Sequence, residues 1–294
     1  MSIVAITGGN GFLGQGAVEQ FANAGYQVRL LYRSSHQNIS DPNITPFKVN
    51  YDNLGLLVQA FEGVETVVHL ADNAGRFTTS DDKPDLSLIV VSAMKLAGVR
   101  RVIFTSSIYA RLNEEGNYSS YGAQKLAAEE AFSNESEIDP IFLRLPPVYG
   151  LNGSGGFALL AKLVAKKLPL PFGTATADRD YISLRNVSSL MVFLSKLDRT
   201  AWNKAVHLKF EPSDNSPLSV ADLCKKIGHV LKLRPILVPI PKFFVIFISK
   251  VVGKEEQMLA AYSSLRVKTE PSLTTICGWR PIEKIPESLN FLSE

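Results

Sequence analysis

The chain has 294 residues, of which 46% are hydrophobic and 20% charged, the composition of an ordinary globular protein. The 31 basic and 28 acidic side chains nearly balance, and no basic stripe is present, which argues against a nucleic-acid partner. Two widely separated cysteines and four histidines without ligand spacing exclude a disulfide scaffold and predict no metal site. Such sparse cysteine is typical of the reducing cytoplasm, where we expect the protein.

The amino terminus does not resemble a secretory signal, because no basic segment precedes the apolar residues 3–6. The most membrane-like stretch, residues 243–249 between Lys242 and Lys250, would span only about 10 Å as a helix. A bilayer core requires about 30 Å. We therefore expect no integral membrane segment, and we predict an amphipathic helix packed on the protein rather than lying on a membrane surface.

The first half of the chain alternates between strand-like and helix-like segments. Short apolar runs predict strands at residues 3–7, 27–32, 66–70, 101–106 and 141–145. Helical patterns lie between them at residues 12–24, 53–61, 85–97 and 118–132. Strands separated by helices of this length pair in parallel through right-handed crossovers, so the sequence predicts an α/β fold with a doubly wound parallel sheet.

A glycine-rich turn joins the first strand to the first helix, where residues 7–14 read TGGNGFLG. Glycines let the backbone turn sharply and approach a pyrophosphate, whose charge then rests on the amino terminus of the helix. The turn opens a strand–helix unit about 30 residues long, the context expected of a dinucleotide-binding motif. The alternative is a tight turn without a ligand.

After Gly150 the regular alternation of strands and helices ends. Glycines and prolines are clustered there, and the predicted helices are shorter and the strands isolated. We predict a dinucleotide-binding domain over residues 1–150 and a smaller, mixed α/β substrate-binding region over residues 151–294, interleaved with the first. Such regions commonly cover the carboxyl ends of the strands, where open α/β sheets bind ligands.

The end of the second predicted strand bears on the choice of cofactor. A carboxylate here would accept hydrogen bonds from the ribose of NAD(H), but the chain reads YRSS over residues 32–35. The guanidinium of Arg33 can instead pair with a 2′-phosphate. We therefore favour NADP(H) over NAD(H), the alternative for Arg33 being a solvated surface cation.

Tyr121 and Lys125 are four residues apart on a predicted helix and project from one face of it. A tyrosine with a pKa near ~10 is a poor acid–base at neutral pH unless a nearby cation favours the phenolate. Lys125 supplies such a cation, and the hydroxyls of Thr105, Ser106 and Ser107 end the preceding strand. After a dinucleotide motif, this order of residues is typical of hydride-transfer enzymes.

Together these motifs resemble the extended short-chain dehydrogenase/reductase family, which includes NAD-dependent epimerases, dehydratases and ketoreductases of nucleotide sugars. The segments that carry the resemblance are TGGNGFLG at 7–14, VVHLA at 67–71, IFTSS at 103–107, YGAQK at 121–125, RLPPVYG at 144–150 and KLPLPFG at 167–173. SLRV at 264–267 and CGWRP at 277–281 are similar to the subgroup of bacterial UDP-sugar 4-epimerases and 4-keto-reductases of surface-polysaccharide synthesis. The resemblance implies a Rossmann-type sheet with a smaller substrate-binding lid.

The resemblance also implies roles for individual residues. Tyr121 would be the acid–base on the sugar oxygen, Ser107 would hydrogen-bond the same oxygen, and Lys125 would hold the nicotinamide ribose. Arg179 would bind the nucleotide or diphosphate of the substrate. The residues expected at the cofactor are Gly8, Gly11, Phe12, Leu13, Gly14, Arg33, Asn50, Leu70, Ala71, Tyr121, Lys125, Pro146 and Val148.

Three functions follow from these expectations. The first is an NADPH-linked reductase of the 4-keto group of a nucleotide sugar, and the second is an NAD-dependent nucleotide-sugar 4-epimerase or dehydratase. The third, a non-catalytic dinucleotide sensor, is opposed by the presence of Ser107, Tyr121 and Lys125 together. The resemblance further implies a homodimer formed through the helices at 85–97 and 118–132.

Overall fold

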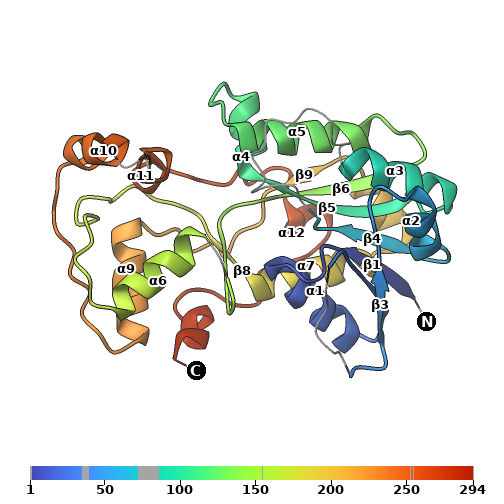
Figure 1. Ribbon diagram of the computed structural model, residues 1–294, viewed down its shortest axis with the longest axis horizontal. Helices are drawn as coiled ribbons and strands as arrows, with labels where there is room; N and C mark the ends of the chain where they lie inside the picture. The colour runs from blue at the N-terminus through green and yellow to red at the C-terminus, as the bar shows by residue number, and fades with distance from the viewer. Residues whose placement is uncertain are drawn as a thin grey trace. The chain divides into compact units, whose positions relative to one another are not determined.

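The computed structural model describes residues 2–34, 40–71, 86–153, 155–251, 253 and 255–293 (Figure 1). The chain forms two compact units, and it passes between them several times. Unit 1 contains Met1–Leu145, Val187–Pro212 and Thr269–Arg280. Unit 2 contains Pro146–Asn186, Ser213–Lys268 and Pro281–Glu294.

Unit 1 is built on a seven-stranded sheet in the order β3-β2-β1-β4-β5-β6-β9, in which every neighbouring pair is parallel. The strand order reverses between β1 and β4, and ligands of doubly wound sheets bind at such a reversal. This topology confirms the predicted α/β fold class. The strands are β1 (Ile3–Thr7), β2 (Gln27–Tyr32), β3 (Ile44–Lys48), β4 (Thr66–His69), β5 (Arg101–Ser107), β6 (Asp139–Leu145) and β9 (Lys209–Phe210).

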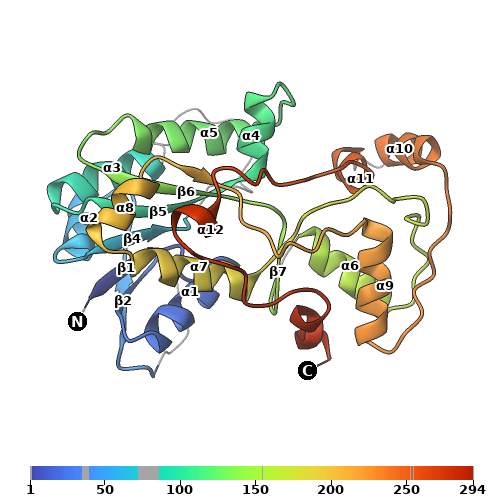
Figure 2. The ribbon, with the colours of Figure 1, turned by 180° about the vertical axis from the view of Figure 1, so that it is seen from behind.

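Helices cover both faces of this sheet: α2, α3 and α5 lie on one face, and α1 and most of α7 on the other (Figures 1 and 2). Between the sheet and the first group lies a core of fully buried side chains that includes Phe61, Met94 and Phe132. Each contributes about 1.5–3 kcal/mol through burial. The helices of this unit are α1 (Phe12–Asn23), α2 (Leu54–Phe61), α3 (Leu86–Leu96), α4 (Ile108–Glu114), α5 (Ser120–Ser133), α8 (Arg199–Ala205), α12 (Leu273–Ile276) and all but the first three residues of α7 (Leu184–Ser195).

Polar side chains fix where several of these helices begin. Asn53 accepts a hydrogen bond from the amide of Leu56 at the start of α2, and Ser119 accepts one from Gly122 at the start of α5. Such caps satisfy amides that lack partners in the first turn and stabilise a helix by about 1 kcal/mol each. They place α5, which carries Tyr121 and Lys125, at a defined position along the chain.

Most of the predicted strands and helices of unit 1 agree with the structure to within two residues, and Asp85, the predicted start of α3, lies outside the described residues. The sequence did not predict β3, β9 or α4. β3 is an edge strand that contains Pro46, which lacks the amide that a central strand would need. β9 is the opposite edge and only two residues long, too short to produce a periodic pattern.

Unit 2 has its own core, in which α6 (Gly156–Ala165) and α9 (Val220–Val230) pack through Phe157, Val164 and Leu223. β7 (Val148–Tyr149) pairs in parallel with β8 (Ile182–Ser183). The remaining elements are α10 (Lys242–Val251), α11 (Glu255–Ala261) and a 3-10 helix at Glu287–Leu292.

A buried carboxylate joins separate segments of unit 2. Asp214 accepts hydrogen bonds from the Tyr149 hydroxyl at 2.5 Å, the Asn186 amide nitrogen at 2.6 Å and the backbone amide of Ser183 at 3.0 Å. Burial raises the pKa of Asp214, and the three donors oppose that shift. The Tyr149 hydroxyl also contacts Ser288, so the same network holds the carboxyl-terminal 3-10 helix.

The predicted helix at residues 243–249 is present as α10, and Val245 and Ser249 are buried against unit 2. The expectation that its apolar side chains pack on the protein is wrong for four of them, because Phe243, Phe244, Phe247 and Ile248 are exposed. Within the described part of the chain, the helices are all too short or too polar to cross a bilayer.

An ion cluster connects α4, α5, β6 and β9 in unit 1. The buried Arg144 guanidinium donates to both oxygens of Glu114, at 2.7 and 2.8 Å, and to both oxygens of the buried Glu129, at 2.6 and 2.8 Å. Lys209 lies 2.9 Å from Glu114 and 3.5 Å from Glu129. The hydrogen bonds from Arg144, and then those from Lys209, hold the pKa of Glu114 at about 2, against the effect of burial.

We predict that Glu114→Gln lowers stability at neutral pH and has less effect in acid. The folded-state pKa is depressed, so the contribution is complete above the unfolded value of about 4.5 and is lost as the pH falls towards 2. The measurement is the urea midpoint of both proteins between about pH 7 and pH 3. Replacement of the exposed Glu19 by Gln is the control, and a pH-independent loss in Glu114→Gln would contradict the role assigned to its charge.

Candidate active site

The glycine turn between β1 and α1 is closely packed against the end of β4. Gly8 has a φ of +67°, and a Cβ on it would lie 2.8 Å from the amide nitrogen of Ala71. A Cβ on Gly14 would lie 2.3 Å from the carbonyl oxygen of Gly8. The turn is closed by a 2.9 Å hydrogen bond from the Gly11 amide to the same carbonyl. The backbone takes this path only because these positions carry no side chain.

The turn places the amino terminus of α1 at the carboxyl ends of the strands. Gly11 is the N-cap and has no side chain with which to cap the first amides, those of Phe12, Leu13 and Gly14. These amides and the helix dipole form a positive site without any charged side chain. The turn lets the backbone come close to a ligand, the amino terminus of α1 is positive, and the strand order reverses beside it. These three features fit the pyrophosphate of a dinucleotide.

Thr7 ties the glycine turn to β4. Its buried hydroxyl lies 2.7 Å from Nδ1 of His69 and accepts hydrogen bonds from the amides of Leu70 and Ala71, each at 3.2 Å. Leu70 and Ala71, both predicted to contact the cofactor, are therefore held beside Gly8. The structure brings this group of predicted residues together.

The hydrogen bonds continue from β4 through β5 to α5. The Thr105 hydroxyl donates to the carbonyl oxygen of His69 at 3.1 Å, and the ammonium of Lys125 donates to the carbonyl oxygen of Thr105 at 3.0 Å. Lys125 is buried, and its Nζ lies 5.3 Å from the centre of the Phe104 ring. The cation is thus held by a carbonyl and an aromatic face at the edge of the sheet.

Tyr121 lies one helical turn before Lys125 on α5. The Nζ atom of Lys125 is 6.0 Å from the centre of the Tyr121 ring, and that ring meets Tyr109 edge-on at 6.2 Å. Tyr121 is half-buried, so its environment is neither fully dry nor fully solvated. The predicted pair therefore shares one face, with the cation under the aromatic ring.

Ser107 ends β5 and begins α4. Its hydroxyl is buried and accepts a hydrogen bond from the amide of Tyr109 at 3.3 Å. Gly122 lets α5 approach α4 closely, because a Cβ there would lie 2.3 Å from the carbonyl oxygen of Tyr109. Tyr109 therefore contacts the elements that carry both Ser107 and Tyr121, and it fixes α4 against α5.

The residues expected at the adenosine end of the cofactor lie at the ends of β2 and β3. Arg33 and Asn50 are exposed, and the side-chain oxygen of Asn50 accepts a hydrogen bond from the amide of Asp52 at 3.1 Å. The next residue, Tyr51, is buried and was not predicted from the sequence. Burial raises the pKa of Tyr51 to about 12, and the Thr7 hydroxyl and the Arg33 charge act in the opposite direction.

The other predicted residues belong to unit 2. Pro146 is buried and Val148 half-buried at the start of that unit. Arg179 is buried, and its Nη1 donates to the carbonyl oxygens of Ala260 and Ser263, the latter at 2.8 Å. These contacts tie the guanidinium to the end of α11, and its contact with a substrate stays a prediction.

Glu129, which was not predicted from the sequence, lies on the same face of α5 as Tyr121 and Lys125. Its carboxylate accepts a 2.5 Å hydrogen bond from Ser106, the neighbour of Ser107, and also binds Arg144. The spacing of four residues from Lys125 was a signal that could have revealed it. Through Glu129 the buried ion cluster fixes α5 against the strand that carries Ser107.

Residues 4–206 match the NAD dependent epimerase/dehydratase family. UDP-glucose 4-epimerase of Vibrio cholerae is 27% identical over 97% of this chain and 92% of its own. UDP-N-acetylglucosamine 4-epimerase of Bacillus cereus superimposes with a TM-score of 0.76 over 99% of this chain and 95% of its own, at 18% identity. UDP-glucose 4-epimerase of Thermus thermophilus, solved with NAD, superimposes with a TM-score of 0.71 over 99% and 97%, at 19% identity. At these identities the two structures show the shared fold.

We predict that Gly14→Ala lowers both thermal stability and the affinity for NAD(H) and NADP(H). The added methyl group would meet the backbone of Gly8 and Gly9 at 2.3–2.5 Å, and overpacking of this kind costs about 1–3 kcal/mol. Calorimetric titration should show at least a ~10-fold weaker Kd. Gly156→Ala, where a Cβ meets nothing within 4 Å, is the matched control. Unchanged affinity in Gly14→Ala would contradict the placement of the pyrophosphate.

Proposed function

Because the chain belongs to the NAD-dependent epimerase/dehydratase family of enzymes, we propose that it interconverts the 4-epimers of a nucleotide sugar. The reaction removes hydrogen from C4 of the sugar and returns it to the opposite face of the ketone. The observation that carries the proposal is the Tyr121–Lys125 face of α5, in which Lys125 is hydrogen-bonded to Thr105, two residues before Ser107 on β5. The V. cholerae relative, matched over almost the full length of both chains, favours epimerisation over reduction.

The proposed cofactor contacts follow the carboxyl edge of the sheet. The turn at Gly8, Gly11 and Gly14 and the first amides of α1 would hold the pyrophosphate. Arg33 and Asn50 would lie at the adenosine end, and Leu70, Ala71 and Lys125 along the ribose and nicotinamide. Pro146 and Val148, which follow β6 in the chain, are also proposed to contact the cofactor. A bound NAD(P) supplies the hydride chemistry, and the protein supplies orientation and proton transfer.

Tyr121 would move the proton of the sugar oxygen. As O4 becomes a carbonyl, the tyrosinate takes its proton, and the tyrosine returns it when the ketone is reduced. The positive charge of Lys125 favours the tyrosinate, and its hydrogen bond to Thr105 keeps that charge in place. The Ser107 hydroxyl would donate to the same sugar oxygen and so orient it for hydride transfer.

The second candidate is an NADPH-dependent 4-keto-reductase, which would use the same residues once per turnover. Arg33 favours this function, because it stands at the end of β2 where NAD-specific enzymes place a carboxylate. The two functions differ in stoichiometry. A reductase consumes one NADPH for each sugar, whereas an epimerase shows no net consumption.

A homodimer is also proposed, through α3 and α5. Leu88 and Leu96, eight residues apart on α3, are exposed apolar side chains, and their burial against a second copy would remove apolar surface from water.

We predict that Tyr121→Phe lowers kcat by about 10²–10⁴-fold, because it removes the acid–base but keeps the ring. The assay is the interconversion of UDP-glucose and UDP-galactose, and of their N-acetyl forms, followed by NMR. The Kd for NAD(P) should stay within about twofold, since the glycine turn is untouched. Tyr118→Phe, at an exposed tyrosine three residues earlier, is the control. Full activity in Tyr121→Phe would contradict the mechanism.

We predict that Arg33→Ser weakens NADPH binding about 10- to 100-fold and leaves NADH binding unchanged, because only the former loses a charge-assisted hydrogen bond to phosphate. Titration of both reduced cofactors measures this, with replacement of the exposed Lys196 by Ser as the control for a lost surface charge. Equal losses for the two cofactors would show that Arg33 does not contact a 2′-phosphate.

A further inference from the structure

α10 turns its large apolar side chains away from the protein. It packs on unit 2 through Val245 and Ser249, both of which are buried. The exposed fractions on its other side are 64% for Phe243, 49% for Phe244, 67% for Phe247 and 58% for Ile248. A helix on a water-soluble surface normally has the reverse arrangement, with apolar residues inward and polar residues outward.

The exposed residues form one continuous face. At 3.6 residues per turn, positions 243, 244, 247 and 248 occupy about 140° of the helix circumference, and positions 245 and 249 lie opposite the centre of that arc. The four exposed apolar side chains are therefore on the side of the helix away from Val245 and Ser249. The outward face contains three aromatic rings and an isoleucine, with no polar side chain among them.

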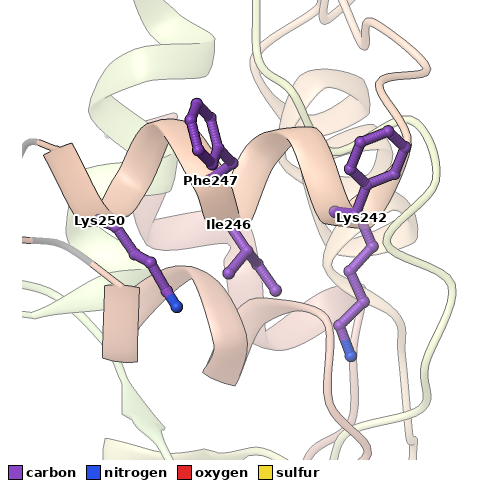
Figure 3. Close-up of a pocket in the computed structure, with 5 residues that line it drawn as sticks. Lys242, Ile246, Phe247 and Lys250 are labelled. Carbon is purple, nitrogen blue, oxygen red and sulfur yellow. The ribbon is translucent and has the colours of Figure 1, made fainter.

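Lys250 borders this face, and Lys242 lies further round the helix on the same side. Figure 3 shows Lys242 and Lys250, at opposite ends of α10, pointing to the same side of the helix as Ile246 and away from Phe247. These four residues and Phe243 line an open pocket of about 510 Å³. α10 itself contains no carboxylate, and Lys250 reaches Glu255 of α11 at 3.2 Å. Lys242 is the first residue of α10, where its charge is repelled by the positive end of the helix dipole. An anion beside Lys242 would offset this repulsion.

The size and charge of the face argue against a second copy of the chain as its occupant. The four exposed side chains present roughly 450 Å² of apolar surface, given ~200 Å² for a large side chain. A stable protein interface buries about 800 Å² on each partner. A two-fold contact through a helix only about 15 Å long would also bring the lysines of both copies together.

We propose that α10 docks the protein on a membrane that contains anionic phospholipid. The Phe243, Phe247 and Ile248 side chains enter the boundary between headgroups and acyl chains, and Lys242 and Lys250 contact lipid phosphates at its edge. Aromatic rings favour that boundary, and lysine stems reach from it to the headgroups. This docking concerns where the protein is held and does not depend on the proposed reaction.

The test is co-sedimentation of the full chain with vesicles of phosphatidylcholine alone or with 30% phosphatidylglycerol, at about 0.1 M salt. We expect at least ~10-fold tighter partitioning on the anionic vesicles, and about fivefold weaker partitioning after each of Lys242→Gln and Lys250→Gln. Phe247→Trp should show a blue shift of its emission on these vesicles only. Phe247→Ser should lose most binding and keep the basal activity in solution.

Ile248→Ser and Ile282→Ser form a matched pair, because the two isoleucines are 58% and 57% exposed. The first should weaken partitioning and the second should not. Equal effects of the pair, or equal binding to neutral and anionic vesicles, would overturn the proposal. Absence of binding at millimolar lipid would also overturn it. So would a dimer detected by light scattering that Phe247→Ser converts to a monomer, since a second copy would then cover the face.

Discussion

One line of hydrogen bonds across the ends of three parallel strands fixes the proposed acid–base pair relative to the glycine turn. It runs from Thr7 on β1 to His69 on β4, from His69 to Thr105 on β5, and from Thr105 to Lys125 on α5. Each step is a short contact between buried groups, and buried polar groups are costly to separate from their partners. A shift of any one strand would therefore move Lys125 relative to Gly8.

The rest of unit 1 supports this line from two sides. On one side, the absence of side chains at Gly8 and Gly14 allows the turn to touch β4. On the other, Glu129 and Arg144 hold α5 against the strand that carries Ser107, with both charges buried and multiply hydrogen-bonded. Breaking one partner of such a buried pair is strongly destabilising, about 3–5 kcal/mol. The fold contributes to the site mainly by fixing the positions of the glycine turn and of α5.

The sequence predicted most of the strands and helices that carry this line to within two residues, because their signals are local. The glycine turn, the strand ends and the spacing of Tyr121 and Lys125 each depend on neighbours within a few residues. What it missed depends on contacts between distant residues: the edge strand with Pro46, the burial of Tyr51, and the pairing of Glu129 with Arg144. The exposure of α10 was also unpredictable, since an apolar helix pattern does not reveal which side meets the protein.

The central claim is that this strand edge binds a nicotinamide dinucleotide, and the most direct measurement is to denature the freshly purified protein and identify any released nucleotide by mass spectrometry. The emptied protein is then titrated with NADH and NADPH. We expect retained NAD(P)⁺, or an empty site that binds a reduced cofactor with micromolar affinity. A protein that releases no dinucleotide and binds neither cofactor would contradict the account.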